Sequence, residues 1–245
     1  EEGEYYGTTA GDPGSGSAPY GAVYRTTKYG NFTLLHAFAG SDGAHPEGQL
    51  VQGNDYYFYG TTRDGGQYGY GTIFRISRSG DFKVLVNFDG ADGRWPEAGL
   101  IQATDGNFYG VTSYGGSWDW GVLFRMTRDG ALTVLHSFTG SLDGAPTGAL
   151  VQGSDGNLYG ASGDPGMLYR ATLDGNLTVL HSFVAASGSA PQSLIQHTDG
   201  RLYGDTYLGG KFGEGVFYCL NAGLPPFLTF LPAFGRVGAL VQILG

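Results

Sequence analysis

Three consecutive residues, Trp118, Asp119 and Trp120, are the most suggestive ligand-binding group in this sequence. Two indole rings beside a carboxylate suit a sugar, because the CH face of a sugar packs on an aromatic ring while its hydroxyls reach a polar group. Tryptophans at such a place can equally pack between neighbouring loops, and both interpretations stay open. The further candidates for ligand binding lie in similar glycine-rich or Pro-containing segments: Trp95, Arg94, Tyr68, Tyr70, His45, Glu47 and Glu97.

Asp42, Asp92 and Asp143 stand at equivalent places in three repeated segments, each directly before a glycine. Oxygen ligands that converge on one axis could hold Ca²⁺. Asp before Gly also forms Asx-type turns, and the fourth equivalent is Ser187, which breaks the set. Calcium is therefore a weak candidate, and the sequence predicts no other cofactor.

His36, His136 and His181 also repeat, which invites a zinc interpretation. They fall on the last strand of each predicted repeat, about three strand spacings of ~4.8 Å from the first. Equivalent outer positions in different repeats cannot converge on one ion. We expect these histidines to be packing or rim residues.

Signs of catalysis are sparse. The chain has no G-x-S-x-G, H-E-x-x-H or P-loop sequence. A carboxylate pair such as Glu47 with Glu97 could in principle cleave a glycosidic bond, but repetition alone would produce the same pair. The sequence favours a protein without catalytic residues, and a polysaccharide-active hydrolase or lyase remains an alternative.

Composition narrows the choice of partners. The 245 residues carry a formal charge of −9, which makes phosphate backbones poor partners, so we expect no nucleic-acid binding. No apolar stretch is long enough to span a membrane, so no direct membrane insertion is expected. The single cysteine, Cys219, excludes an internal disulfide. The 46 glycines and 14% aromatic residues indicate many tight turns and a core between short strands.

One unit of about 45 to 50 residues, the length of a four-stranded propeller blade, recurs along the chain. Its clearest copy begins GALVQGSDGNLYG (residues 148–160), and variants begin at residues 48, 98 and 192. The chain opens on an incomplete copy, EEGEYYG (residues 1–7), and the missing half appears as GALVQ at residues 238–242, identical to residues 148–152. The chain therefore looks like a ring of five repeats cut inside one of them.

Each repeat predicts four strands, because short runs of β-branched and aromatic residues alternate with Gly, Asp and Asn turns. In the second repeat these runs are residues 50–52, 57–62, 71–77 and 81–88. We expect an all-β, five-bladed β-propeller of four-stranded antiparallel blades, forming a single domain over residues 1–245. Its C-terminal strand, residues 239–243, would pair with residues 5–9 and close the ring. The predicted blades are residues 1–47 plus 238–245, 48–97, 98–147, 148–191 and 192–234.

In such blades the loops between the second and third strands, and those between blades, emerge on one face. The Asp-Gly turns emerge on the other. The first set is long and variable, and binding residues concentrate on variable loops held by a rigid scaffold. We call this side the long-loop face and place any site on it. Glutamines that end the first strands, such as Gln102 and Gln152, are predicted to hydrogen-bond around the central channel.

The recurring sequences Y-G-T-T, G-G followed by G-T-[VI]-F, and T-V-L-H-x-F-x-G-x-D-G-x-x-P resemble the tandem GloVer repeat of exported bacterial proteins, over residues 5 to about 222. The name derives from Gloeobacter- and Verrucomicrobia-type examples. The resemblance implies an extracellular or cell-surface location, often without an assigned activity. Residues 223–245 resemble the start of an immunoglobulin-like IPT/TIG domain, although their GALVQ also fits a closing strand.

Together these features predict a non-catalytic binding module that recognises a glycan or a protein through the long-loop face. A structural subunit that self-associates through its terminal strands is a second possibility, since residues 239–243 could complete the blade of a neighbouring copy.

Overall fold

The computed structural model describes residues 3–11, 18–141, 143–163, 166–184 and 186–226 with their side chains, and the backbone of residues 229–231 and 242–244. These residues form strands, turns and loops. No helix in the described part of the chain is long and apolar enough to cross a membrane. The predicted all-β class is confirmed.

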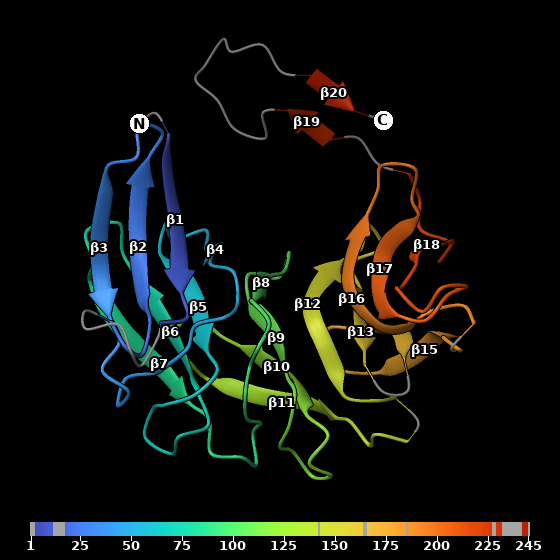
Figure 1. The fold of residues 1–245 in the computed structure, drawn as a ribbon, viewed down its shortest axis with the longest axis horizontal. Coiled ribbons are helices and arrows are strands. Elements are labelled where there is room, and N and C mark those ends of the chain that lie inside the picture. The colour runs from blue at the N-terminus through green and yellow to red at the C-terminus, as the bar shows by residue number, and fades with distance from the viewer. Residues whose placement is uncertain are drawn as a thin grey trace.

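Five sheets of three or four strands follow one another around a central space, as the blades of a β-propeller do (Figure 1). In every sheet the strands pair antiparallel in chain order. The first sheet contains β1 (Glu4–Thr9), β2 (Ala22–Thr27) and β3 (Phe32–Ala37). The second contains β4 (Val51–Gln52), β5 (Phe58–Thr62), β6 (Thr72–Ile76) and β7 (Phe82–Asn87).

The remaining three sheets repeat this arrangement. The third contains β8 (Ile101–Gln102), β9 (Phe108–Thr112), β10 (Val122–Met126) and β11 (Leu132–Ser137). The fourth contains β12 (Pro146–Gln152), β13 (Leu158–Ser162), β14 (Met167–Ala171) and β15 (Leu177–Ser182). The fifth contains β16 (Ser189–Gln196), β17 (Leu202–Leu208) and β18 (Phe217–Leu220). The strands expected in the second repeat therefore form within one residue of their predicted bounds.

The core lies between consecutive sheets. One buried cluster joins Val23 and Phe38 of the first sheet to Phe74 of the second, and three further clusters join the second sheet to the third, the third to the fourth, and the fourth to the fifth. The second, third and fourth sheets thus bury both faces against their neighbours, whereas the described clusters cover one face of the first sheet and one face of the fifth. This burial of apolar surface holds the five sheets in order.

A glycine in the second strand of each sheet makes room for an aromatic ring from the third strand. Gly110 on β9 pairs directly with Phe124 on β10. A Cβ atom at Gly110 would lie 2.6 Å from Phe124 Cζ, so no larger residue fits without displacing the ring. This close approach explains why the Y-G pair recurs in every repeat.

Glutamines connect the third, fourth and fifth sheets each to the sheet before it. Gln152 Oε1 accepts a hydrogen bond of 2.9 Å from the backbone N–H of Thr104, and Gln102 accepts the equivalent bond from Asn54. Gln196 repeats the contact with the N–H of Ser154 at 2.8 Å. The tight turns are fixed by a second repeated bond, in which a tyrosine hydroxyl donates to the turn aspartate, as Tyr109 does to Asp105 at 2.8 Å.

The expected closing pair is not formed among the described strands. β1 pairs with β2 and with no other strand, whereas β20 (Gln242–Leu244) pairs antiparallel with β19 (Thr229–Leu231). β19 lies within the predicted fifth blade, residues 192–234, but it does not pair with the strands of the fifth sheet. Residues 239–241 of the predicted closing strand lie outside the described residues. Two segments close in sequence satisfy each other's backbone groups at a lower ordering cost than a pairing across the ring. The resulting hairpin lies between the first and fifth sheets (Figure 1).

Candidate ligand-binding site on the long-loop face

The three residues of the tryptophan pair and its carboxylate have different surroundings. Asp119 adopts a left-handed backbone (φ 61°) and accepts hydrogen bonds from Gly115 N at 2.9 Å and from Arg94 Nη2 at 2.8 Å. Trp120 packs over Gly140, where a Cβ atom would lie 2.4 Å from the indole ring. Trp120 thus covers Gly140 and remains 42% exposed, whereas Trp118 is 65% exposed.

Trp118 is one of three exposed aromatic residues at the same loop position. Tyr68 in the second sheet and Phe212 in the fifth occupy the equivalent place in the loop between the second and third strands, and they are 52% and 81% exposed. Phe212 was not among the predicted site residues, although the shared sequence G-G-x-aromatic would have identified it. Uncovered aromatic rings therefore recur around the long-loop face.

Arg94 is surrounded by aromatic rings. Its guanidinium lies 5.3 Å from the ring centroids of Trp95 and Tyr114, and 6.0 Å from that of Tyr70. Trp95 and Tyr114 meet edge to face, with centroids 5.1 Å apart. This cation–π packing, together with the ion pair to Asp119, stabilises the junction between the second and third sheets. Three predicted binding residues, Arg94, Trp95 and Tyr70, thus lie together.

At the preceding junction a polar pair replaces the aromatic one. His45 Nδ1 lies 3.0 Å from Asp64 Oδ2, at the positions that Trp95 and Tyr114 occupy one sheet later. His45 and Trp95 both adopt left-handed φ values, 53° and 57°, directly before a proline. The repeat therefore fixes the backbone here and leaves the side chains free to differ.

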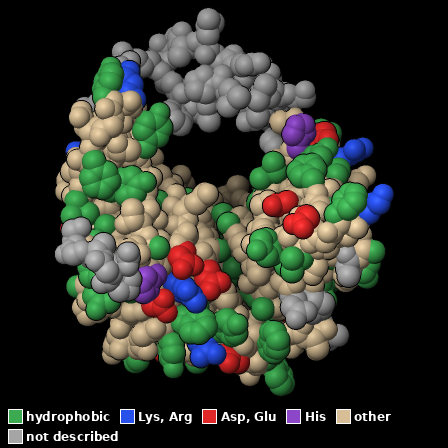
Figure 2. All heavy atoms as spheres, in the orientation of Figure 1, with side chains coloured by type: hydrophobic (Ala, Val, Ile, Leu, Met, Phe, Trp, Pro, Cys, Tyr) green, Lys and Arg blue, Asp and Glu red, His purple; other side chains and the backbone are tan. Residues whose placement is uncertain are grey.

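The predicted carboxylate pair is bridged by an arginine. Arg63 lies 3.6 Å from Glu47 Oε1 and 3.3 Å from Glu97 Oε1, and Ser113 donates a 2.9 Å hydrogen bond to Glu97 Oε2. Both oxygens of Glu97 are thus engaged, which suits an ionised, positioned carboxylate better than a general acid. Arg63 and Ser113 were not predicted. Figure 2 shows acidic and basic side chains gathered beside a histidine on the face in view.

The residue at or just after the end of the second strand differs in every repeat. Arg63 and Ser113 occupy this position in the second and third sheets. The five residues are Ala10, Arg63, Ser113, Gly163 and Tyr207.

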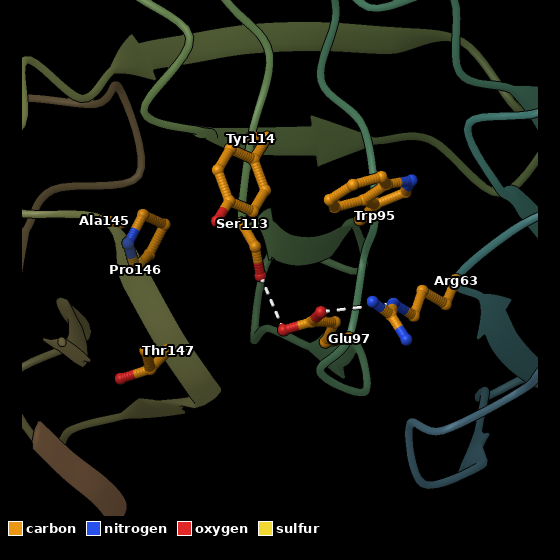
Figure 3. A pocket seen from close by; sticks show the side chains of 8 residues that line it. All are labelled: Arg63, Trp95, Glu97, Ser113, Tyr114, Ala145, Pro146 and Thr147. Carbon is orange, nitrogen blue, oxygen red and sulfur yellow. Dashed lines mark hydrogen bonds and ion pairs between the residues drawn. The ribbon is translucent and has the colours of Figure 1, made fainter.

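A hollow of about 240 Å³ opens between the third and fourth sheets (Figure 3). Ser113, Glu97 and Arg63 form a connected row along one side, the rings of Trp95 and Tyr114 stand beside them, and Pro146 and Thr147 lie across from them. A second hollow of about 350 Å³ shares Glu97, Ser113, Pro146 and Thr147 and continues to Gln192. Of the predicted site residues, this place brings together Trp95 and Glu97, and it leaves Tyr68, Trp118 and His45 elsewhere.

The three aspartates proposed as calcium ligands each bind within their own turn. Asp42 and Asp143 accept backbone N–H bonds from Ala39 and Thr139, and they pair with His36 at 2.8 Å and His136 at 2.7 Å. The described residues contain no group of three or more His, Cys, Asp or Glu side chains able to hold a metal ion. Calcium therefore gains no support from the geometry. The predicted Asx-type turn is not formed either, because the bonds come from the preceding residues and not from the N–H two residues later.

Asp92 has the same turn bond, from Asp89 N at 2.9 Å, but Val86 stands where His36 and His136 stand in their sheets. Burial raises the pKa of Asp92 to about 6, and the neighbouring charge of Asp89 adds to the rise. For Asp143, burial also favours the neutral form, but the hydrogen bonds from His136 and Thr139 outweigh it and hold the pKa below its usual value.

The repeated sequence is that of a known family. The model of the Gloeobacter/Verrucomicrobia repeat family matches residues 1–218. This match covers the motifs of the predicted resemblance and stops before residues 223–245, so it does not extend to the IPT/TIG-like stretch. No curated protein matches the sequence.

Solved structures with a similar fold are β-propeller-like proteins of different activities. They include an inactive virginiamycin B lyase from Staphylococcus aureus with quinupristin, at a TM-score of 0.57 and 18% identity, covering 75% of this chain and 55% of that one. A chain of a nidogen–laminin complex has a TM-score of 0.57 and 16% identity, covering 91% and 76%. A protein described as the extracellular domain of a hybrid two-component system from B. thetaiotaomicron has a TM-score of 0.56 and 17% identity, covering 91% and 27%. At these identities the likeness concerns the fold alone.

Proposed function

Because the chain belongs to the Gloeobacter/Verrucomicrobia repeat family, we propose that it is an exported, non-catalytic binding module that recognises carbohydrate through its long-loop face. The observation that carries the proposal is the recurrence of uncovered aromatic rings at Tyr68, Trp118 and Phe212. A ring that the fold leaves in water at the same loop position in three repeats offers a stacking surface for sugars. Several such surfaces on one rigid scaffold suit a ligand that itself repeats, such as a polysaccharide.

Two further observations support binding rather than cleavage. The carboxylates of Glu47 and Glu97 share Arg63, and Ser113 engages the remaining oxygen of Glu97. Binding of extracellular polysaccharide also fits a place outside the cell, and a similar structure is described as an extracellular domain.

The test is binding to an array of plant and bacterial polysaccharides. We expect Trp118→Ala to weaken binding about fivefold, since an aromatic contact contributes on the order of 1 kcal/mol, and Tyr68→Ala with Phe212→Ala to weaken it further. Tyr29→Ala is the matched control, because Tyr29 is 80% exposed in a tight turn on the opposite face. A wild-type protein that binds no glycan on the array would contradict the proposal and leave a protein ligand as the explanation of this face.

A second candidate, self-association through strand exchange, is favoured by the free edge of β1. Within the described residues, this strand pairs on one side only, whereas β5, β9 and β13 pair on both. Such an edge can accept a strand from another copy. Oligomers of the full chain that become folded monomers when residues 227–245 are removed would support it, and a full chain that stays monomeric would exclude it.

A further inference from the structure

We propose that the hollow between the third and fourth sheets binds one neutral pyranose unit of the carbohydrate. The inference rests on the proposed function and names a site within it. It concerns the row Arg63, Glu97 and Ser113, the rings of Trp95 and Tyr114, and Thr147 on the opposite wall (Figure 3).

The hollow arises from side chains that differ between repeats. At the junction between the second and third sheets, the guanidinium of Arg63 lies over the Trp95 ring at 5.4 Å and occupies the space. One junction later the equivalent residues are Ser113 and Ala145, which are both small. The same backbone hydrogen bond is kept, from Ser113 N to Trp95 O at 3.1 Å and from Gly163 N to Ala145 O at 2.8 Å. Two large side chains are thus replaced by small ones while the backbone hydrogen bond is kept, and this leaves an open space at the junction between the third and fourth sheets.

The walls match the chemistry of a sugar. Trp95 and Tyr114 supply apolar surface for CH groups. Glu97 accepts hydrogen bonds, and Ser113 and Thr147 can both donate and accept. Arg63 Nε is buried and makes no hydrogen bond among the described residues, although it lies 3.3 Å from Glu97. This ion pair holds Glu97 in place as an acceptor for a ligand hydroxyl.

Charge and size select the class of ligand. Arg63 is flanked by two carboxylates, Glu47 and Glu97, so the hollow offers no excess positive charge to a phosphate or a uronic acid. A neutral polyol, whose hydroxyls both donate and accept, fits this balance. The 240 Å³ equal the share of about eight water molecules in the liquid, enough for one six-membered ring with its hydroxyls. The adjoining hollow toward Gln192 gives a longer saccharide a way to continue.

The experiment is a titration with methyl glycosides of glucose, galactose, mannose and N-acetylglucosamine, followed by indole fluorescence and by ligand-observed NMR. We expect saturable binding of at least one. Ser113→Arg should weaken it about tenfold or more, because it copies Arg63 and fills the hollow. Ser117→Arg is the matched control: it adds the same charge at an exposed position of the same loop and should leave monosaccharide binding unchanged. Thermal unfolding checks that both variants are folded.

The outcomes separate this inference from the proposed function. Monosaccharide binding that Ser113→Arg abolishes and Trp118→Ala preserves supports the site. If polysaccharides bind, and folded Ser113→Arg binds them and every monosaccharide as the wild type does, the site is overturned while the proposed function stands. Wild-type protein that binds polysaccharides but none of the four glycosides also overturns the site. If no carbohydrate binds at all, both fail together.

Discussion

At the scale of single residues, one aspartate position has two different surroundings. Asp42 and Asp143 each combine a backbone N–H bond with a histidine, whereas Asp92 has Val86 in place of the histidine and Asp89 as a neighbour. At the same position of the repeat, the pKa of the carboxyl group is therefore lowered in one repeat, at Asp143, and raised in another, at Asp92. Differences of this kind decide how the protein responds to pH.

Asp92→Asn is expected to stabilise the protein at pH 7. The pKa of Asp92 is raised from 3.8 to about 6, so the folded state binds the proton more tightly than the unfolded state. The favourable contribution of the protonated group is complete below pH 3.8 and is lost as pH rises through 6. An asparagine keeps the turn acceptor without the charge. The gain is about 0.5–1 kcal/mol, because solvent screens a half-buried group, and chemical denaturation at pH 4, 5, 6 and 7 measures it.

Asp143→Asn is the matched control with the opposite sign. Because hydrogen bonds hold the pKa of Asp143 below its usual value, its contribution is present above the unfolded pKa and is lost at lower pH. This variant should lose about 1 kcal/mol at pH 7. If both substitutions changed the free energy of unfolding at pH 7 by the same amount and sign, the opposite pKa shifts assigned to Asp92 and Asp143 would be contradicted.

Residue patterns predicted the turns well and the binding group only in part. Asp followed by Gly indicates an Asx turn, which Asp105 and Asp155 form with the N–H groups two residues later. Asp42, Asp92 and Asp143 instead accept a backbone N–H from three or four residues earlier. The partner of Asp119 is Arg94, 25 residues earlier, and no local pattern links the two. The role of Trp120 likewise depends on Gly140, which comes from another segment. The hollow beside Ser113 was not predicted. It exists because Ser113 and Ala145, which are distant in sequence, are both too small to fill the space between them.

At the scale of strands, the repeat is held in register by a glycine under an aromatic ring. Gly110 lies beneath Phe124, Gly60 beneath Phe74, and Gly160 beneath Tyr169, each ring within 2.6 Å of a would-be Cβ atom. The strands themselves were predictable, because turn residues separate short apolar runs. The contact of this glycine was not predictable, because the Y-G pair does not indicate which aromatic ring will pack over it.

Gly110→Ala should destabilise the protein by about 1–3 kcal/mol through overpacking of β9 against β10. The new methyl group would meet both Phe124 and Leu100, which are buried. Denaturant titration gives the loss. In a double-mutant cycle, Phe124→Leu should cost less in the Gly110→Ala background than in the wild type, because a smaller side chain leaves room for the methyl group. Additive effects would show that the ring and the glycine are not coupled.

At the scale of the whole molecule, the repeat predicts the order of the sheets. It does not determine how the C-terminal segment pairs with the first sheet. Identity between residues 148–152 and 238–242 suggested a strand that closes the ring, and such identity shows what a segment can pair with rather than what it does pair with. In the structure β20 pairs with β19, and β1 keeps one edge unpaired within the described residues.

Removal of residues 227–245 is therefore expected to leave the five sheets folded. No described strand of those sheets pairs with β19 or β20, and Leu224, which packs in the cluster between the fourth and fifth sheets, is retained. The free energy of unfolding should change by less than about 1 kcal/mol. Circular dichroism and thermal unfolding measure this. Loss of the cooperative transition would mean that the removed segment closes the ring after all.

Five equivalent residues lie at or just after the end of the second strand of each sheet: Ala10, Arg63, Ser113, Gly163 and Tyr207. Their differences have a consequence for how a partner would be held. A scaffold built from near-identical repeats would ordinarily bind a ligand in several equivalent orientations, related by rotation about its axis. Here the five repeats differ at this position: in chain order they carry a methyl group, a cation, a hydroxyl, no side chain and a phenol. An occupant near the axis thus meets only one orientation in which all its groups are matched, so a pseudo-symmetric frame can still impose a single pose.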